Sequence, residues 1–453
     1  MKNNERTNNR KDMNEIIRAE GSRKHHIRIY IAALLAAQML LLPFAGCASG
    51  GGTSSAMSNT ADTSAAVVTL ENGSEAAVSA AGKSSSVSLT AADLFSDRDL
   101  EQTADLSEAT KYTLQSGKDI TISTAGIYLI SGSAKGSTII VEAGDDDKVQ
   151  IVLDGVSMEN ADFPCIYVKS ADKVFLTLTG GNKLSVTGTF KTDGDTKTDG
   201  VIFSKDDLVC NGTGSLTISS TDNGIVGKDD VKFTGGTYSI TAASKAVEAN
   251  DSIRISDGAF TVKAGTDGFH SENEDDDTLG YIYIGGGSFS IDAGDDGIHG
   301  TSLVQIDGGS FTVKAAECIE GTYILINNGT LTLASWDDGI NAAKKSSAYT
   351  PTVEINGGSL TITMGAGDTD GIDSNGNIIV NGGTVSVTGN SSFDYDGTAQ
   401  FNGGTIYVNG QQVTEIPNQM MGGRGGRGGM NGMNGNNGMN GNNGGRMGGR
   451  RRG

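Results

Sequence analysis

The sequence predicts an all-β fold, a single-stranded parallel β-helix or solenoid. Among 453 residues there are 67 glycines but only 4 prolines, and 6% are aromatic, a mixture that suits short strands and tight turns. From residue 208 the chain divides into rows of 20–23 residues, such as "IYIGGGSFSIDAGDDGIHGTSL". Each row has alternating strands, a glycine turn and an acidic turn. No row can bury its apolar face alone, so the rows must stack, with equivalent residues in columns about 4.8 Å apart.

Two other repeat folds fit less well. A propeller blade needs about 40 residues, and leucine-rich repeats need a leucine and asparagine frame that these rows lack. Before residue 208 the rows are less regular, but "VQIVLDGVSMENADFPCIYVKSADKVFLTLTGGNKLSV" still alternates and is expected to form the first coils. Residues 90–103 are expected to open with a short helix capped by Thr90, near the N-terminal end of the solenoid.

The two ends of the chain read as segments outside the solenoid. "RKHHIRIY", the short apolar run "IAALLAAQMLLLPF" and "AGC" resemble a bacterial lipoprotein signal that ends before Cys47, the expected lipidation site. An ordinary secretory signal is the alternative. The predicted organisation is a signal at 1–46, a flexible tether at 47–88, the β-helix at 89–412 and a disordered tail at 413–453. We therefore expect an exported protein, either a cell-surface lipoprotein or secreted.

The charge distribution limits the partners. The net charge is −20 although both ends are basic, so the body between them is still more acidic. Such a body repels nucleic acid and anionic membrane and attracts cations, so we expect membrane contact only through the lipid anchor. Cys165, Cys210 and Cys318 lie far apart and fit no metal spacing. We expect no disulfide framework and a monomer.

Several segments carry a resemblance to a known family. "FSDRDL", "IVLDGV", "VIFSKDDL", "FDYDGT" and the Gly/Met/Asn tail resemble the bacterial carbohydrate-binding-domain-containing family, over about residues 94–410 and the tail. That family consists of exported right-handed parallel β-helices with a fold similar to that of pectate lyases. The resemblance implies a right-handed helix, calcium binding, and binding of cellulose or pectin-like polysaccharide without established catalysis.

The acidic turns are the candidate metal sites. An Asp-Gly pair can be only a solvated turn, in which glycine takes a positive φ and aspartate bonds its own backbone. Stacked carboxylates disfavour one another's ionisation, however, and Ca²⁺ accepts such carboxylates in irregular geometry. The predicted calcium ligands are Asp267, Asp295, Asp296, Asp337, Asp338, Asp368, Asp370 and Asp373.

Three residues interrupt or accompany the acidic turns. Lys245 replaces the acid in "ASKAVEAN", either as a salt-link partner for its neighbours or as the base of a calcium-dependent lyase. It is the one weak catalytic candidate. His270 and His299 occupy equivalent places in adjacent rows, followed by Asn341 and Asp373. Stacked imidazoles could bind a transition metal, although a polar ladder is favoured.

The scarce aromatic residues are candidates for sugar stacking. Trp336 precedes Asp337 directly, and Tyr323 lies at a row edge; the predicted polysaccharide-binding residues are Trp336, Tyr281, Tyr283 and Tyr349. The alternative for Trp336 is that it covers a gap at the solenoid edge. The sequence thus favours a surface-anchored, calcium-binding and polysaccharide-binding protein without catalysis. A calcium-dependent polysaccharide lyase or hydrolase and a structural or adhesive surface protein are the alternatives.

Overall fold

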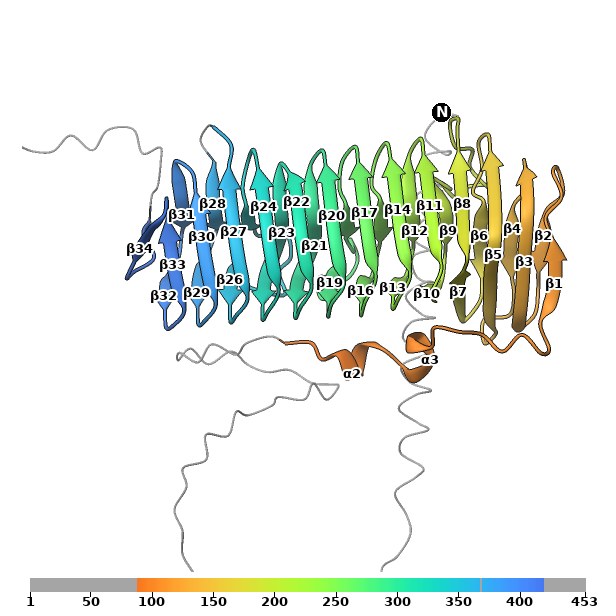
Figure 1. The fold of residues 1–453 in the computed structure, drawn as a ribbon, viewed down its shortest axis with the longest axis horizontal. Coiled ribbons are helices and arrows are strands. Elements are labelled where there is room, and N and C mark those ends of the chain that lie inside the picture. The colour runs from red at the N-terminus through yellow and green to blue at the C-terminus, as the bar shows by residue number, and fades with distance from the viewer. Residues whose placement is uncertain (1–87, 367–368, 419–453) are drawn as a thin grey trace, which may run out of the picture. The chain divides into compact units, whose positions relative to one another are not determined.

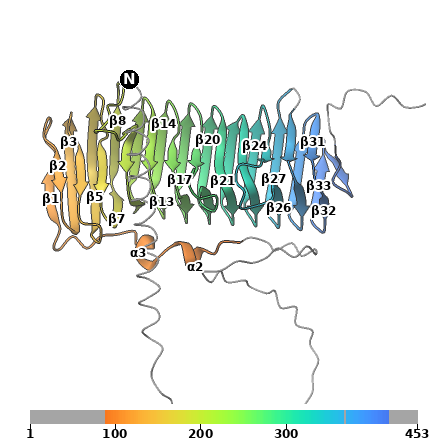
Figure 2. The ribbon, with the colours of Figure 1, turned by 180° about the vertical axis from the view of Figure 1, so that it is seen from behind.

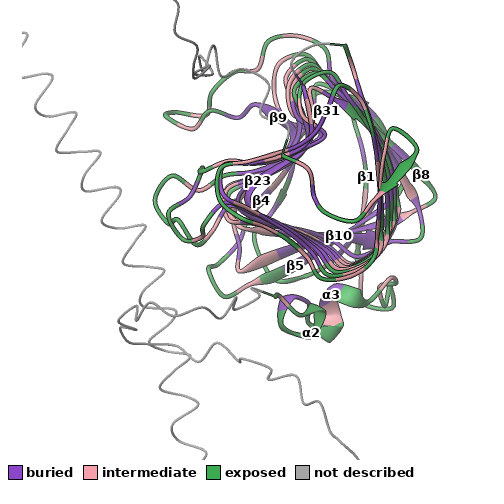
Figure 3. Ribbon diagram, turned by 90° about the vertical axis from the view of Figure 1, so that its left-hand side faces the viewer, coloured by how far each residue is buried: buried purple, intermediate pink, exposed green. Residues whose placement is uncertain are grey.

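The computed structural model describes residues 88–366 and 369–418, which form a right-handed parallel β-helix (Figures 1 and 3). The fold class predicted from the row pattern is confirmed. Its strands pair in parallel throughout the described residues, except that β33 pairs antiparallel with β34 (Gln411–Val413), and two isolated bridges are antiparallel. The predicted signal, all of the tether but residue 88, and the tail beyond 418 lie outside the described residues.

The strands form three faces, seen end-on in Figure 3, and successive coils run the length of the solenoid in both side views (Figures 1 and 2). The first face contains β1 (Thr110–Thr113), β7 (Lys173–Thr179), β10 (Asp207–Gly212), β13 (Asp230–Phe233), β16 (Ser252–Ile255), β19 (Tyr281–Ile284), β26 (Thr352–Ile355), β29 (Asn377–Val380) and β32 (Ala399–Phe401). The second contains β8 (Gly181–Val186), β11 (Ser215–Ser220), β14 (Thr237–Ala242), β17 (Ala259–Ala264), β20 (Ser288–Ala293), β22 (Ser310–Ala315), β24 (Thr330–Ser335), β27 (Ser359–Met364), β30 (Thr384–Thr388) and β33 (Thr405–Val408).

The third face carries the acidic turns. It contains β2 (Ile120–Ile122), β4 (Ile139–Glu142), β6 (Ile166–Ser170), β9 (Gly200–Ser204), β12 (Asn223–Gly227), β15 (Val247–Ala249), β18 (Phe269–Ser271), β25 (Ile340–Ala342), β28 (Asp370–Ser374) and β31 (Ser391–Tyr395). Four longer strands bend across corners: β3 (Gly126–Lys135) and β5 (Lys148–Asn160) join the first face to the second, and β21 (Asp296–Ile306) and β23 (Glu317–Ile326) join the third to the first.

The pairing register confirms the predicted period. Ile282 pairs with Val304, and Val304 pairs with Ile324, which are steps of 22 and 20 residues. On the second face alternate residues are buried, and stacked rings form one column of the core: Tyr238, Phe260, Phe289 and Phe311, with centroids 5.0, 5.0 and 4.5 Å apart. At a corner between faces, the side-chain amides of Asn356 and Asn381 each donate to the preceding asparagine of the column, at 2.8 and 2.7 Å. Identical side chains therefore hold neighbouring coils in register.

The N-terminal segment, residues 88–102, contains two single-turn helices, α2 (Ala91–Leu94) and α3 (Asp97–Leu100). Thr90 precedes α2 as predicted, but its hydroxyl contacts the Asp93 carboxylate and caps no backbone N–H. Ser96 instead caps α3, in a capping box with Asp99.

The expectation that this segment lies at the end of the solenoid is wrong. Figure 3 shows it alongside the first face. Gln102 donates to the Thr234 carbonyl at 3.0 Å, and Gln305 donates to the Leu89 carbonyl at 2.9 Å. The segment therefore spans several coils instead of protecting a strand edge.

Two further expectations concern cysteines and membrane contact. Cys165, Cys210 and Cys318 are free thiols buried in the core, and burial raises the pKa of Cys165 to about 12. Within the described part of the chain, no helix is long and apolar enough to cross a membrane. Cys47, the predicted lipidation site, lies outside that part.

Candidate functional site

Two polar columns run along the third face. The turn column lies where the chain enters each strand, just before the strand or at its first residue. It consists of Lys245, Asp267, Asp296, Glu317, Asp338 and Asp370. The strand column lies three residues further on and consists of Glu248, His270, His299, Glu320, Asn341, Asp373 and Asp394. The predicted succession of His270, His299, Asn341 and Asp373 is confirmed, but Glu320 stands between His299 and Asn341 and was missed. Its row, "AECIEG", lacks the Asp-Gly pair that marks the other turns.

The glycines that directly follow aspartates of the turn column allow neighbouring coils to approach closely. A Cβ on Gly297 would lie 2.6 Å from the Cys318 carbonyl oxygen, and one on Gly339 would lie 2.4 Å from that of Gly371. The expectation of a positive φ after these aspartates is wrong, because the positive values occur in the other turns, as at Gly287 and Gly309. Gly is therefore required in the acidic turns by space and not by left-handed backbone.

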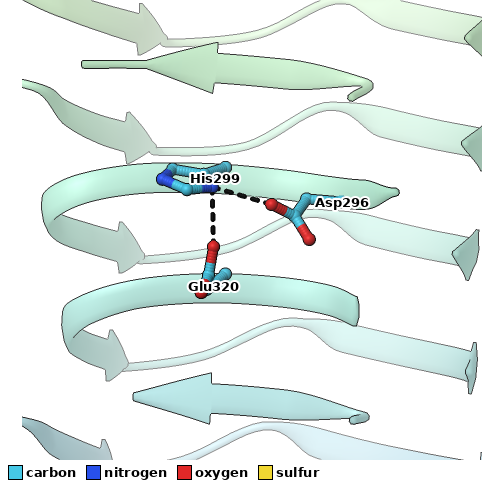
Figure 4. A group of neighbouring side chains, drawn as sticks. All are labelled: Asp296, His299 and Glu320. Atoms are coloured by element: carbon cyan, nitrogen blue, oxygen red, sulfur yellow. Dashed lines mark hydrogen bonds and ion pairs between the residues drawn. The ribbon is translucent and has the colours of Figure 1, made fainter. Parts of the chain in front are cut away.

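Around the histidines, the carboxylates of the two columns form ion pairs with basic side chains. Nδ1 of His299 lies 2.7 Å from both Asp296 Oδ2 and Glu320 Oε2 (Figure 4). Burial favours a neutral imidazole, but the hydrogen bonds to Asp296 and Glu320 outweigh it and raise the pKa of His299 to about 9. Burial likewise opposes ionisation of Glu320, yet the hydrogen bond from His299 lowers its pKa to about 2. Lys345 adds a second cation, 2.7 Å from Glu320 Oε1.

Two inserted loops cover this part of the columns. Lys345 belongs to the loop after β25, and in the same loop the Ser346 hydroxyl donates to the Asp277 carbonyl in the loop after β18, at 2.6 Å. His270 contacts Asp267 Oδ2 at 2.9 Å. It also contacts Glu272, which begins the loop after β18, at 3.3 Å. The loops explain why residues on the outer side of a strand are nearly inaccessible here.

Further along the solenoid, the same columns contain only oxygen ligands. We call Asp338, Asn341, Asp370, Asp373 and Asp394 the oxygen cluster. Burial, with neighbouring carboxylates, raises the pKa of Asp338 to about 6 and that of Asp373 to about 7. The buried oxygens Asn341 Oδ1 and Asp394 Oδ1 accept no hydrogen bond from the described residues. The cluster therefore has excess negative charge and oxygen acceptors suited to a hard cation.

The predicted calcium ligands thus fall into different places. Asp338 and Asp370 interact electrostatically with Asp373 in the oxygen cluster, whereas Asp267 and Asp296 pair with histidines. Asp295 and Asp337 are exposed beside the turns, and Asp368 lies outside the described residues.

A second group of carboxylates was not predicted. Asp207, Asp229 and Asp230 approach one another where the chain enters strands β10 and β13 of the first face, next to Asp251. Burial and the neighbouring aspartates raise the pKa of Asp207 to about 6. Arg254 offsets part of this charge, 2.7 Å from Asp230. The doublets in "KDDL" and "KDDV" are the sequence signal that identifies the group.

The predicted stacking residues also separate into accessible and covered ones. Trp336 is 47% exposed at the turn that leads to Asp338. Tyr283 is only 2% exposed, because Phe95 of the N-terminal segment packs on it, with ring centroids 6.1 Å apart. Tyr281 packs in the same cluster with Arg254 over its ring. Of these two predicted polysaccharide-binding residues, Tyr283 is thus covered by the N-terminal segment and Tyr281 is partly covered. Tyr349 is half-buried against Tyr323.

Lys245 lines a cleft of about 310 Å³ beside the histidines. Lys228, Glu248, His270 and Glu272 also line it. The ammonium of Lys245 lies 3.8 Å from Glu248 Oε2, so its ion pair is with the strand column and not with the acidic turns of neighbouring rows. The cleft carries both signs of charge, which sets it apart from the acidic surface around it.

Comparison with known proteins identifies relatives. A profile of the family described as carbohydrate-binding domain-containing protein matches residues 116–366 and 316–413. A curated protein of that description from Acetivibrio thermocellus is 34% identical over 132 residues, which are 28% of this chain and 46% of that relative. The match spans about half the length of that relative. Among solved structures, a gadolinium derivative of the polysaccharide lyase-like protein from C. thermocellum aligns with a TM-score of 0.39 and 22% identity, covering 66% of this chain and 94% of that one.

Proposed function

This chain belongs to the family of carbohydrate-binding domain-containing proteins, and we propose that it binds polysaccharide at Trp336, with calcium held by the oxygen cluster. The observation that carries the proposal is the exposure of Trp336, 47%, two residues before Asp338. A sugar ring stacked on the indole would lie next to the cluster. Amphipathic aromatic rings are effective contacts for ligands that are apolar on one side and polar at the edge.

Calcium is the cation that the oxygen cluster favours. It takes six to eight oxygen ligands from carboxylates, amides and water in flexible geometry. Four carboxylates and the Asn341 amide supply such oxygens, and a bound cation would offset the burial and the carboxylate repulsion that together raise the pKa of Asp373 to about 7. Coordination positions left to water could accept hydroxyl or carboxylate oxygens of a glycan.

The glycan class follows from charge. The acidic body repels a polyanion such as pectate, so we expect calcium to bridge the protein and the sugar carboxylates. Neutral cellulose needs no such bridge, and stacking on Trp336 should dominate its binding. A long chain lying along the solenoid could engage repeated weak contacts, which add through avidity.

The test is a pull-down of the full chain with insoluble pectate and cellulose, in calcium and in excess EDTA. Trp336→Ala should reduce binding to both glycans without lowering the melting temperature. Leu106→Ala is the matched control, since Leu106 is also exposed, 37%, and lies far from Trp336 in sequence. Pectate binding that persists in EDTA rejects the calcium bridge. Unchanged binding of Trp336→Ala to both glycans assigns the tryptophan to packing, and a protein that binds neither glycan supports the structural or adhesive alternative.

We also propose that the protein is displayed on the cell surface. The support is the lipoprotein-like signal that ends just before Cys47, together with the acidic body that follows. Cys47→Ala should shift the protein from the membrane fraction to the soluble fraction in the producing cell. Equal partition of both proteins would favour the secreted form.

A second candidate function is a calcium-dependent polysaccharide lyase. The cleft beside Lys245 supports it, because the Lys228 ammonium could hold a sugar carboxylate while Lys245 removes the proton α to that carboxylate. In this candidate function Lys245 is the residue on which catalysis depends.

A further inference from the structure

We propose that Asp296, His299 and Glu320 form a binding site for a divalent transition metal, separate from the oxygen cluster and independent of glycan binding. One atom from each residue lies within 4.8 Å of the other two. The exposed fractions of the three residues are 6%, 8% and 5%, so the group is almost closed to solvent. A mixed nitrogen and oxygen set of this kind suits Zn²⁺ or Co²⁺.

The fold brings the three side chains together through one strand and its neighbour. Asp296 and His299 begin β21, and His299 is in register with Glu320 on β23. Gly297 allows the close approach of the next coil, because a Cβ there would lie 2.4 Å from Val313 Cγ1 and 2.6 Å from the Cys318 carbonyl oxygen. Figure 4 shows both carboxylates pointing toward the same ring nitrogen.

One ring nitrogen faces two carboxylates, and a bound cation could take the place of the imidazolium proton between them. Nδ1 lies 2.7 Å from Asp296 Oδ2 and 2.7 Å from Glu320 Oε2, so a single N–H is shared between two acceptors. With the nitrogen and each oxygen at their present spacing, a cation about 2.1 Å from each of them would have an N–metal–O angle of about 80°. Widening the spacing to about 3.4 Å would give a tetrahedral angle, so small side-chain movements suffice.

The surrounding residues orient the ligands. Lys345 lies 2.7 Å from Glu320 Oε1, which leaves Oε2 directed at His299. The Asp296 backbone N–H donates to Asp267 Oδ1 at 3.3 Å and ties this turn to the preceding one. Such outer partners commonly fix the ligands of metal sites.

A second imidazole lies beside the group. The rings of His270 and His299 have centroids 4.6 Å apart, and His270 is only 7% exposed. Its Nδ1 forms no hydrogen bond with the described residues, although it lies 2.9 Å from Asp267 Oδ2. A rotation of this ring could add a fourth ligand.

The ligand chemistry separates this site from the calcium cluster. Calcium requires six or more oxygens, whereas this group offers two carboxylates and an imidazole. Imidazole is a preferred ligand of zinc, copper, nickel and iron. The oxygen cluster, in contrast, contains no histidine.

The test uses the full chain with His25→Asn and His26→Asn in every protein, because these are the other two of its four histidines. After EDTA treatment and dialysis, we expect one equivalent of Co²⁺ with a d–d absorption band, displaced by Zn²⁺ but not by excess Ca²⁺. His299→Gln and Glu320→Gln should lose the band and weaken uptake at least tenfold. Asp373→Asn, in the oxygen cluster, is the matched control and should retain both.

Circular dichroism of each variant establishes that it is folded. Should a variant not fold, X-ray absorption of the zinc-loaded parent decides the matter, with imidazole scattering expected. Absence of stoichiometric Co²⁺ uptake by the folded parent overturns the proposal. So does an unchanged band in folded His299→Gln, or a zinc spectrum without imidazole. None of these outcomes depends on whether a glycan binds.

Discussion

Asp99 on α3 and Lys232 on β13 form a buried ion pair, with 3.1 Å between Oδ2 and Nζ. Lys173, two coils earlier on the first face, lies 3.6 Å from the other Asp99 oxygen. Burial opposes ionisation of Asp99, but the Ser96 backbone N–H and the two lysines lower its pKa below the usual value. The N-terminal segment is therefore joined to two coils through one carboxylate.

Replacing Asp99 should destabilise the solenoid measurably. Asp99→Asn leaves Lys232 buried without its counter-charge, and breaking such a pair typically costs about 3–5 kcal/mol. We expect a loss near the lower figure in urea unfolding of the full chain. Glu159→Gln is the control, because its partner Lys135 is 74% exposed at the side chain and surface pairs contribute about 0–1 kcal/mol. Equal effects of the two changes would contradict the role assigned to Asp99.

Calcium should raise the melting temperature through the oxygen cluster. A ligand that binds only the folded state stabilises it by mass action, about 2.7 kcal/mol at a hundredfold excess over Kd. Asp338→Asn and Asp373→Asn should each reduce calcium uptake in titration calorimetry and shrink the thermal shift. Asp257→Asn, an exposed aspartate in another turn, should change neither. Calorimetry without calcium uptake, together with melting unaffected by EDTA, would refute the cluster as a calcium site.

Without calcium, stability should fall as the pH rises from about 4 to about 7. Burial and the neighbouring carboxylates raise the pKa of Asp373 from 3.8 to about 7, so the folded state holds a proton that the unfolded state has released. Stability decreases with pH wherever the folded state binds more protons. In EDTA, melting temperatures measured across this range should decline for the parent and decline less for Asp373→Asn. Parallel declines in both proteins would exclude Asp373 as a source, and calcium should flatten the parent curve.

The row period made the columns predictable, whereas their ion pairs depend on three-dimensional register. Equivalent places of His270 and His299 follow from counting residues between turns. Glu320 escaped detection because Glu317-Cys318 replaces Asp-Gly in its row, so no local motif marks it. Only the pairing of β21 with β23 puts it opposite His299.

The packing of the N-terminal segment could not be predicted from the sequence for a different reason. The alternation of a strand indicates which residues point outward, and by that criterion Tyr283 belongs on the surface. The N-terminal segment then covers it through Leu94 and Phe95, which come from a part of the chain with no repeat. The segment is held on the first face by contacts such as that of Gln102 with Thr234. These residues are far apart in the sequence, so no local pattern predicts their contact.

The last prediction concerns lyase activity at the cleft beside Lys245. We expect the full chain with calcium and pectate to release no unsaturated product. Lys245 pairs with Glu248, and the oxygen cluster lies several coils away along the columns. Ultraviolet absorbance of the unsaturated ends measures this over prolonged incubation. A steady rise that Lys245→Ala abolishes, while Lys263→Ala on the second face leaves it intact, would establish the catalytic alternative. A rise that survives Lys245→Ala would point to a contaminating enzyme or to another base in the cleft, which His270→Gln would then distinguish.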